Sequence, residues 1–521
     1  MNYKVLITTS GIGSRLGELT NYTNKSLIRV GKKPAISYIV ERYPDDIELV
    51  ITLGYFGDHV RDFLELAYPQ KNFTFVNVDK YEGEGSSLGY SMLQAKEHLQ
   101  CPFIFHASDT IMLSDYKPEP NENFLITSGG KDASQYRTIT LNHSDNGVTI
   151  HEKGSLQYNR LYIGVAGIFD YELFWNGLEN EYNKNPNNQS LSDCNGLKYV
   201  TNKKTPIILN KDWLDMGNST ELKKSRELIP DKFEILDKVD ESIFLFDDFV
   251  IKFFADKEVN LNRVKRNQIL DGLVPKMLGH KDNFYNYEYA KGEDLPNVVN
   301  EKIFSNLLNH LKENLWTNKH NDPSFREKCI DFYVNKTNKR IDKFLSDNNL
   351  KDEITIINGI EIPPVKELLK QIPYHTLVTD YPSNFHGDLV LDNIIYNTET
   401  KKFTLIDWRQ DFAGSLEDGC VHYDLSKLNH NLIFNHEIVN KGNYKIEINK
   451  NGIICDILCS KNLLECQKVL HYFIIKNGYD LNKVNILTPI IWINMSALHS
   501  GDLGNFLFYF GKLNLYKALN S

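Results

Sequence analysis

The sequence has few cysteines, only seven in 521 residues, and no two of them are spaced as a Cys-x-x-Cys pair. An odd, scattered set of this kind indicates neither a disulfide framework nor a zinc site. Long blocks of like charge are missing too: 59 basic and 68 acidic residues give a net charge of −9. We therefore expect no nucleic-acid partner.

Long apolar runs are missing as well. The longest stretches, at 161–169 and 486–495, are shorter than the roughly 20 residues that cross a bilayer as a helix. The N-terminus passes from one lysine into a short strand-like run, without the apolar region of a signal peptide. We therefore expect a cytoplasmic protein without a membrane partner.

The first half of the sequence alternates short β-branched runs with helical patterns. This alternation favours an α/β fold, a parallel sheet covered by helices. The composition changes near 225–235, and we place one domain at 1–228 and a second at 235–521. The expected strands are 4–9, 48–52, 73–78 and 103–106, and the expected helices are 34–43, 58–66 and 87–98.

The second half begins with short strand-like runs at 234–236, 243–246 and 249–254 and continues from 301 with long amphipathic segments. This order predicts a small antiparallel sheet followed by a larger helical part, an α+β arrangement.

A glycine loop follows the first expected strand. Gly11 and Gly13 let backbone N–H groups approach phosphates, with Ser14 beside them, and Arg15 supplies a fork of donors. Lys25 adds a second cation. The same loop also suits a tight strand-to-helix turn, and it lacks the third glycine of the dinucleotide fingerprint.

Two aspartates lie at the ends of expected strands. Asp109 follows the strand 103–106, where an open α/β sheet presents ligands, and Asp215 follows Trp213-Leu214. The two carboxylates could share a divalent metal ion. A carboxylate at a strand end is, alternatively, a common cap or turn residue.

Taken in this order, the motifs of residues 1 to about 225 resemble the sugar-phosphate and choline-phosphate nucleotidyltransferases. The resemblance implies a Rossmann-like fold in which the glycine loop, Arg15 and Lys25 hold a nucleoside triphosphate while Asp109 and Asp215 hold Mg²⁺. A metabolite phosphate would then attack the α-phosphorus and expel pyrophosphate. One departure is Asn24, where the family normally has proline before its lysine.

The same resemblance suggests substrate contacts. Glu152, Lys153 and Gly164 lie between the two aspartates and would contact the phosphorylated metabolite. The segment 81–88 falls where the family contacts the base. Its Ser87-Leu88 pair is similar to the cytidylyltransferase branch, which favours CTP, with Ser87 as a nucleotide-binding residue.

A second chemistry is indicated by His386-Gly-Asp-Leu-Val-Leu-Asp-Asn393 and the later Leu-Ile-Asp-Trp run. Phosphoryl transfer to a hydroxyl needs a carboxylate that accepts the hydroxyl proton and oxygen ligands for Mg²⁺. Asp388 fits the catalytic base, and Asn393 and Asp407 fit the metal ligands.

Residues 235–521 resemble the aminoglycoside phosphotransferase and choline kinase family. The resemblance implies a protein-kinase-like α+β fold that binds ATP through Lys252, with the adenine near a hinge at Glu288. The helix after Lys252 has no acid at the expected place, which leaves Glu258 as the candidate partner of that lysine.

The acceptor of this second reaction is suggested by Arg409. Choline-kinase-like relatives usually carry an acid here, whereas a guanidinium would repel a quaternary ammonium and suit a hydroxyl-rich or anionic molecule. Alternatively, Arg409 pairs with Asp411 or Glu417 on the surface.

Two such activities on one chain suggest consecutive steps. ATP would phosphorylate a small hydroxyl compound, and a nucleotide would then be coupled to that phosphate, giving an activated donor for a surface polysaccharide or lipid. The versions left open are a choline kinase with a phosphocholine cytidylyltransferase, an anomeric sugar kinase with an NDP-sugar pyrophosphorylase, and a nucleotidyltransferase with a silent kinase-like module. The oligomeric state, a homo-oligomer included, is also open.

Overall fold

The computed structural model describes residues 3–115, 117–129, 133–141, 147–156, 158–229, 238–317 and 321–521. Contacts divide the chain into two compact units: unit 1 is Met1–Asn260 with Leu278–Tyr287, and unit 2 is Leu261–Met277 with Glu288–Ser521. The strand expected at 234–236 lies outside the described residues.

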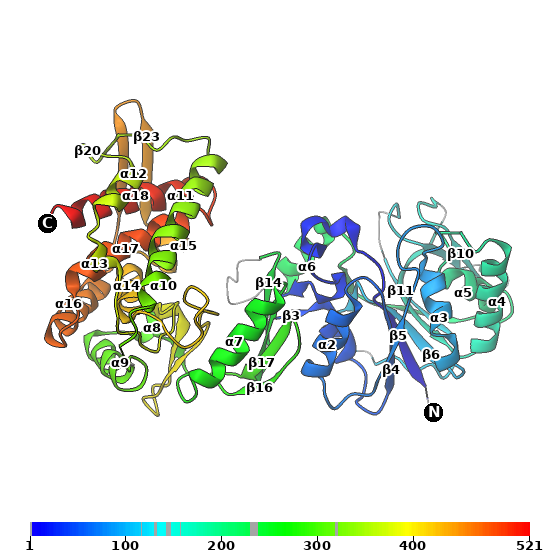
Figure 1. Ribbon diagram of the computed structural model, residues 1–521. Helices are drawn as coiled ribbons and strands as arrows, with labels where there is room; N and C mark the ends of the chain where they lie inside the picture. Colours follow the sequence, from blue (N-terminus) through cyan, green and yellow to red (C-terminus); the bar gives the residue numbers. More distant parts are fainter. Residues whose placement is uncertain are drawn as a thin grey trace. The chain divides into compact units, whose positions relative to one another are not determined.

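Unit 1 is built on a nine-stranded sheet whose main path runs β10-β9-β11-β6-β1-β4-β5 (Figure 1). The strands β6, β1, β4 and β5 are parallel, and β11 joins them antiparallel to β6. The expected parallel sheet is therefore confirmed. The helix expected at 87–98 is shorter, because α3 ends at Gln94 and a separate 3₁₀ turn, η3 (Lys96–His98), follows.

The elements up to residue 228 are β1 (Lys4–Thr8), η1 (Ser14–Thr20), η2 (Lys25–Leu27), β2 (Arg29–Val30), β3 (Lys33–Pro34), α1 (Ala35–Val40), β4 (Glu48–Leu53), α2 (Gly57–Ala67), β5 (Phe73–Asn77), α3 (Leu88–Gln94), β6 (Phe103–Ala107), β7 (Thr110–Met112), β8 (Phe124–Ser128), β9 (Thr138–Leu141), β10 (Val148–His151), β11 (Arg160–Ile168), α4 (Tyr171–Lys184), α5 (Asp193–Thr201), β12 (Ile207–Asn210), β13 (Trp213–Asp215) and α6 (Ser219–Leu228).

Successive residues of β1 pack on opposite faces of this sheet. Val5 and Ile7 belong to the hydrophobic cluster that contains Phe63 of α2, whereas Leu6 belongs to the cluster that contains Trp175 of α4. Continuous apolar strands are typical of parallel sheets that helices cover on both faces. This packing leaves the carboxyl ends of β1 and β6 to carry polar residues.

A small four-stranded sheet, in the order β14-β15-β17-β16, also belongs largely to unit 1. Its strands β14 (Glu241–Leu245) and β15 (Phe249–Phe254) confirm the two strands expected after residue 240. The ring of Phe63 on α2 lies 5.2 Å from that of Phe244 and 6.2 Å from that of Phe284. The first strands after the expected boundary therefore pack on helix α2.

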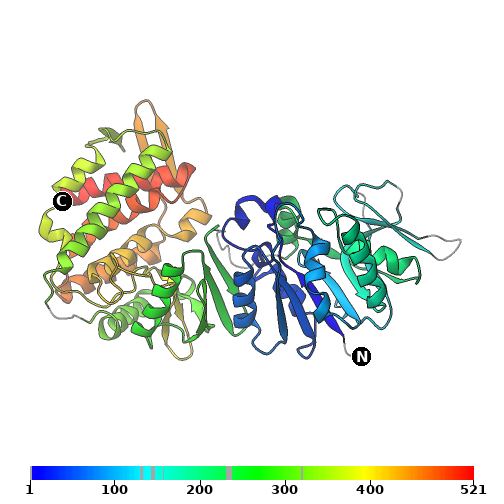
Figure 2. The ribbon, with the colours of Figure 1, turned by 45° about the vertical axis from the view of Figure 1, so that its right-hand side comes forward.

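Unit 2 is mostly helical, as expected from residue 301 onward. Helices α17 and α18 lie side by side in both views, and a hairpin of β23 and β24 projects beyond them (Figures 1 and 2). A separate three-stranded sheet, β18-β21-β22, carries the segment that contains Asp388 and Asp407. Within the described ranges, the helices fall short of the length and apolar character that a membrane crossing requires.

The remaining elements are α7 (Lys257–Ile269), β16 (Met277–His280), β17 (Phe284–Glu288), β18 (Glu293–Asp294), α8 (Leu295–Val298), α9 (Glu301–Asn314), α10 (Phe325–Ile330), the π-helical turn η4 (Asp331–Asn335), α11 (Lys336–Asp347), β19 (Thr355–Ile357), β20 (Ile360–Ile362), α12 (Val365–Gln371), α13 (Tyr374–Leu377), η5 (Leu391–Asn393), β21 (Ile394–Tyr396), β22 (Phe403–Leu405), α14 (Val421–Ile433), α15 (His436–Asn440), β23 (Tyr444–Asn449), β24 (Gly452–Ile457), α16 (Lys461–Lys476), α17 (Leu481–Ser496) and α18 (Gly501–Leu519).

Candidate functional site

The glycine loop of unit 1 turns directly after β1. Gly13 has a φ of +73°, and a side chain there would place its Cβ 2.8 Å from the Cβ of Lys25. Glycine is therefore required at this position, both for its backbone conformation and for the close approach of Lys25. Gly11 and Ser14 are exposed, so the loop presents its backbone to solvent.

Lys25 is held beside Asp109 by a buried anchor. The Nζ of Lys25 lies 2.9 Å from Oδ2 of Asp109. The residue before it, Asn24, is fully buried and donates through Nδ2 to the carbonyl oxygens of Thr9 (2.8 Å) and Tyr55 (2.6 Å). Asn24 thus joins the lysine segment to the ends of two neighbouring strands, where the resemblance leads one to expect a proline.

The two aspartates of unit 1 are brought together by strand pairing. β13 runs antiparallel to β7, with Asp215 opposite Thr110, next to Asp109. A side chain at Gly217 would place its Cβ 3.0 Å from Oδ1 of Asp215, 3.2 Å from Nη2 of Arg15 and 3.5 Å from Oδ2 of Asp109. Two carboxylates and a guanidinium therefore converge on one point.

Electrostatics differ between the two carboxylates. Burial and the nearby Asp109 raise the pKa of Asp215, although Tyr136 donates to its Oδ2 at 2.7 Å. Burial also acts to raise the pKa of Asp109, but Lys25 and Arg15 outweigh it, and that pKa lies below its usual value. A divalent cation between the carboxylates of Asp109 and Asp215 would offset the repulsion that raises the pKa of Asp215.

The donor set fits Mg²⁺ bound through one or two carboxylates and substrate phosphates. Asp109 and Asp215 supply the carboxylates, and Arg15, whose side chain is exposed, lies beside them. Among the described residues, no group of three or more His, Cys, Asp or Glu side chains could hold a metal ion. Mg²⁺ ordinarily keeps several waters and binds substrate phosphates, which would complete its coordination here.

The three expected substrate contacts lie in different surroundings. Lys153 is exposed, and burial of its ammonium group and then Arg15 lower its pKa, whereas Asp109 and Asp215 act in the opposite direction. Gly164 has a φ of +81° in a bulge of β11, where a side chain would meet the Cβ of Ala107 at 2.9 Å.

Glu152 is held by two cations. Its carboxylate pairs with Lys198 at 2.8 Å and with Arg137 at 3.4 Å. These pairs give it a structural partner on α5. Ser87, expected to bind the nucleotide base, caps α3 by accepting from the backbone N–H of Tyr90 at 3.0 Å. The roles of Glu152 and Ser87 toward substrates stay predictions.

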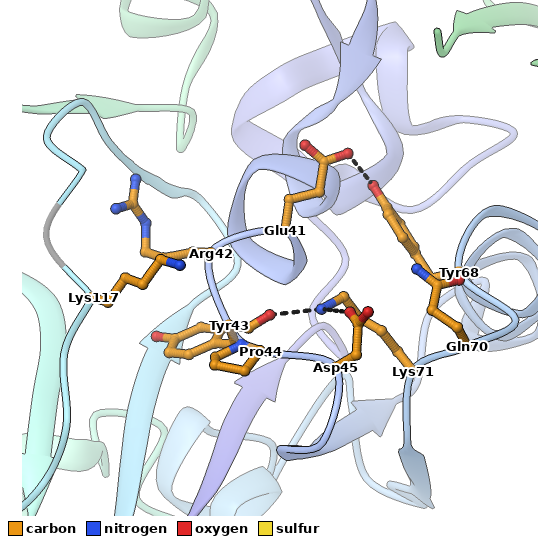
Figure 3. Close-up of a pocket in the computed structure, with 9 residues that line it drawn as sticks. All are labelled: Glu41, Arg42, Tyr43, Pro44, Asp45, Tyr68, Gln70, Lys71 and Lys117. Carbon is orange, nitrogen blue, oxygen red and sulfur yellow. Dashed lines mark hydrogen bonds and ion pairs between the residues drawn. The ribbon is translucent and has the colours of Figure 1, made fainter. Parts of the chain in front are cut away.

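A cavity of about 330 Å³ in unit 1 has a different lining (Figure 3). Two cations of its lining already have partners: Lys71 bonds the carbonyl of Tyr43 at 2.6 Å and Asp45 at 2.8 Å, and Arg42 donates to backbone carbonyls, at 2.6 Å in the case of Ser114. None of the predicted site residues lines it, and we assign it no ligand. Its lining residues are Glu41, Arg42, Tyr43, Pro44, Asp45, Tyr68, Gln70, Lys71 and Lys117.

In unit 2, Asp388 and Asn393 lie on one tight loop. The Nδ2 of Asn393 donates to the backbone oxygen of Asp388 at 2.8 Å, so its amide oxygen is the atom left to ligate a metal. Lys427 pairs with Oδ1 of Asp388 at 2.7 Å. Burial opposes ionisation of Asp388, but Lys427 outweighs it and holds the pKa well below the usual range.

His386 fastens this loop to the segment of Asp407. Its Nε2 lies 3.0 Å from the oxygen of Ile406, and its own carbonyl accepts from the N–H of Arg409 at 3.0 Å. Burial lowers the pKa of His386 to about 3, so the ring is neutral. Asp407, between these two anchored residues, has a φ of +59° and lies 3.8 Å from Arg263.

Two charged residues that the sequence did not predict support this loop. Asp424 on α14 is fully buried and accepts from the N–H groups of His386 (2.8 Å) and Gly387 (2.7 Å) and from Trp316 (3.1 Å). Burial raises its pKa to about 6 despite these donors. In the sequence it is one of several polar residues of α14, so the pattern alone does not distinguish it.

Arg266 is the second residue that supports this loop. It is fully buried and donates to the backbone oxygens of Leu416 (3.0 Å), His386 (3.2 Å), Phe385 and Arg409. Burial lowers its pKa to about 9, which leaves it cationic at neutral pH. In the sequence it is one of several basic residues on an amphipathic helix.

The expected ATP contacts remain predictions. Lys252 is buried within β15, at 3% exposure, and Glu258 is exposed in the first turn of α7. Glu288 lines a cavity of about 330 Å³ in unit 2 and lies 4.0 Å from Lys276.

Comparisons with known proteins bear on the N-terminal half. No family model matches the chain. The bifunctional protein GlmU of Methanocaldococcus jannaschii is 21% identical over 251 residues, which are 47% of this chain and 60% of that protein. The choline-phosphate cytidylyltransferase of Streptococcus pneumoniae is 28% identical over 116 residues, 22% of this chain and 48% of that protein.

The similarity to nucleotidyltransferases thus covers about half of the chain, and the chain spans about half the length of the curated relatives it matches. Among solved structures, the CTP:phosphocholine cytidylyltransferase of Streptococcus pneumoniae aligns with a TM-score of 0.38 at 19% identity, covering 44% of this chain and all of that one.

Proposed function

We propose that the N-terminal half transfers a nucleotidyl group from a nucleoside triphosphate, CTP by preference, to the phosphate of a small metabolite. The observation that carries the proposal is the convergence of Asp109, Asp215 and Arg15 on one point, with Lys25 bonded to Asp109. Similarity to a choline-phosphate cytidylyltransferase supports the preference for CTP.

The reaction needs positioning and charge neutralisation more than a side-chain nucleophile. An oxygen of the metabolite phosphate bonds to the α-phosphorus, and the bond to the bridging oxygen of the β-phosphate breaks, so that pyrophosphate leaves with the electron pair. Arg15 and Lys25 would neutralise the charge of the triphosphate. Asp109 and Asp215 would hold Mg²⁺, which supplies charge neutralisation when bound.

We further propose that residues 235–521, whose Asp388 loop lies in unit 2, transfer the γ-phosphoryl group of ATP to a hydroxyl group. Asp388 would accept the hydroxyl proton, and its pair with Lys427 holds the carboxylate in place in its ionised form. Asn393 and Asp407 would hold Mg²⁺. The intact set of these residues favours an active phosphotransferase over a silent module.

The two reactions would follow one another. The phosphate placed on the hydroxyl compound by unit 2 is the group that the N-terminal half would couple to the nucleotide. The product would be an activated donor for a surface polysaccharide or lipid, made in the cytoplasm from ATP and CTP. The version with an anomeric sugar kinase and an NDP-sugar pyrophosphorylase is the second candidate.

Pyrophosphate release tests the first half of the proposal. The full chain should release pyrophosphate from CTP and Mg²⁺ when given phosphocholine, sugar 1-phosphates or other phosphorylated metabolites. Asp109→Asn should abolish this release, whereas Asp212→Asn, which changes an exposed acid just before β13, should not. Equal activity of the two variants would contradict the assignment.

A further inference from the structure

An aromatic ring in unit 2 lies beneath two cations. The Nζ of Lys336 is 4.2 Å and the Cζ of Arg409 is 5.1 Å from the ring centre of Phe332. Phe332 is in the π-helical turn η4, which interrupts the run from α10 to α11. Such turns are rare inside α-helices and are frequent at functional sites.

The two cations belong to a larger basic group. Burial lowers the pKa of Lys336 well below its usual value, and Arg409, Arg340 and Lys427 lower it further. Burial and Arg409 likewise lower the pKa of Arg340. We call Lys336, Arg340 and Arg409 the basic cluster.

The acids that face the basic cluster are few. The negative charge of Asp411 acts to raise the pKa of Lys336. Asp388 is already paired with Lys427 at 2.7 Å. Arg409 donates through Nε to the backbone oxygen of Asp411 at 2.9 Å, a neutral acceptor. Among the described residues, Asp411 and Asp388, which also interacts with Arg409, do not balance these cations and Lys427, and an excess of positive charge in a partly buried place is costly without an anion.

The basic cluster adjoins the proposed catalytic loop. A side chain at Gly387 would place its Cβ 2.7 Å from the Cβ of Arg409, and Gly387 directly precedes Asp388. Since the hydroxyl that Asp388 deprotonates must lie within hydrogen-bond reach of it, the rest of the acceptor extends into this neighbourhood.

We propose that the acceptor of the phosphotransfer is a hydroxyl compound with an anionic group, a carboxylate or a phosphate, which the basic cluster binds. This inference rests on the proposed phosphotransferase function of unit 2. In the reaction, the acceptor oxygen bonds to the γ-phosphorus of ATP, the bond to the β-phosphate bridging oxygen breaks to give ADP, and the hydroxyl proton passes to Asp388.

A cationic acceptor such as choline fits this place poorly. The ring of Phe332, which could otherwise attract a quaternary ammonium, already has Lys336 over it. Three like charges would repel the ligand as well. A guanidinium, in contrast, binds carboxylates and phosphates through two parallel hydrogen bonds.

Matched acceptors test the inference on the full chain. ADP release with ATP and Mg²⁺ would be measured for glycerol, glycerate, glycerol 3-phosphate and choline, and for glucose, glucuronate and glucose 6-phosphate. We expect the anionic members to have kcat/KM values at least about tenfold above their neutral counterparts. A comparison of glycerate and glucuronate with glycerol 3-phosphate and glucose 6-phosphate shows whether a carboxylate or a phosphate is preferred.

Substitutions test whether the basic cluster causes the preference for anionic acceptors. Lys336→Gln and Arg340→Gln should each raise KM for the best anionic acceptor about tenfold, with KM for ATP unchanged. Lys339→Gln, on an exposed position of the same helix, should change neither. Circular dichroism would show that the variants are folded, and two separate substitutions guard against one that is not.

The outcomes separate the two claims. ADP release that prefers glycerol, glucose or choline, or that is unchanged in both variants, overturns the anionic acceptor while the phosphotransferase stands. No ADP release with any acceptor, from protein that still releases pyrophosphate, overturns the phosphotransferase and this inference together.

Discussion

The candidate sites of the two units each pair an aspartate with a lysine, but different forces position them. In unit 1, Lys25 bonds Asp109 at 2.9 Å, and backbone pairing of β13 with β7 brings Asp215 beside it. In unit 2, Lys427 bonds Asp388 at 2.7 Å on a loop without regular strand pairing.

The loop of unit 2 relies on buried charged groups. Asp424 accepts three N–H groups, and Arg266 donates to four backbone oxygens. Backbone hydrogen bonds between paired strands persist through most side-chain substitutions. Removal of one buried charged side chain, in contrast, leaves its polar partners unpaired, which lowers the stability of the fold considerably. Supporting residues should therefore be more sensitive to substitution in unit 2 than in unit 1.

The largest expected effect separates the two chemistries. Asp388→Asn should lower ADP formation about a thousandfold, because the base for the hydroxyl proton is lost. Pyrophosphate release from an acceptor that already carries its phosphate should persist. Asp109→Asn should show the reverse. Loss of both activities in folded protein of either variant would mean that the sites are not independent.

The second prediction concerns the small sheet on α2. Phe63→Ala removes a fully buried ring that contacts Phe244 and Phe284, and it should lower the free energy of unfolding by about 3–5 kcal/mol. Chemical denaturation followed by circular dichroism measures this. Glu65→Ala, which removes only the exposed ion pair with Lys281, should cost less than about 1 kcal/mol.

A small effect of Phe63→Ala would show that residues 241–254 do not depend on α2 for their packing. The chain could then be divided at 235 without loss, as the domain boundaries drawn from the sequence suggest.

The third prediction addresses the buried support of unit 2. Arg266→Met leaves four backbone oxygens without this donor and should destabilise the protein by about 3 kcal/mol. Lys265→Met, at the exposed neighbouring position, should be nearly neutral. The two thermal midpoints give the comparison, and equal midpoints would show that the loop has other support.

The smallest effect is a shift of pH dependence in unit 1. The hydroxyl of Tyr136 donates to Asp215 and favours its ionised form. Tyr136→Phe should therefore raise the pKa of Asp215 further and move the acid limb of pyrophosphate release to higher pH, because a protonated carboxyl binds Mg²⁺ poorly. A limb that moves to lower pH, or not at all, would contradict this assignment.

Much of unit 1 could be predicted from the sequence. The alternating runs, the glycine loop and Asp109 are signals that each lie within a few neighbouring residues. The proximity of Asp215 depends on the three-residue strands β7 and β13, whose short patterns predict little alone. Glu152 was expected at the substrate, but its ion pairs with Lys198 and Arg137 arise from contacts that sequence spacing does not show.

The support of unit 2 was less predictable. The roles of Asp424 and Arg266 follow from burial against a loop that is distant in sequence, and charged residues are ordinarily exposed. The basic cluster is a similar case: Arg409 stood out beside the Asp407 motif, whereas Lys336 and Arg340 come from a helix far from it.

The central claim is that one chain phosphorylates a hydroxyl compound and then couples that phosphate to a nucleotide. The direct test gives the full chain CTP, Mg²⁺ and a hydroxyl acceptor, with and without ATP, and measures ADP and pyrophosphate together. We predict that pyrophosphate appears only when ATP is present, that Asp388→Asn abolishes it, and that the phosphorylated acceptor restores it in that variant. Pyrophosphate release from the unphosphorylated acceptor without ATP, or at an undiminished rate in Asp388→Asn, would contradict the account.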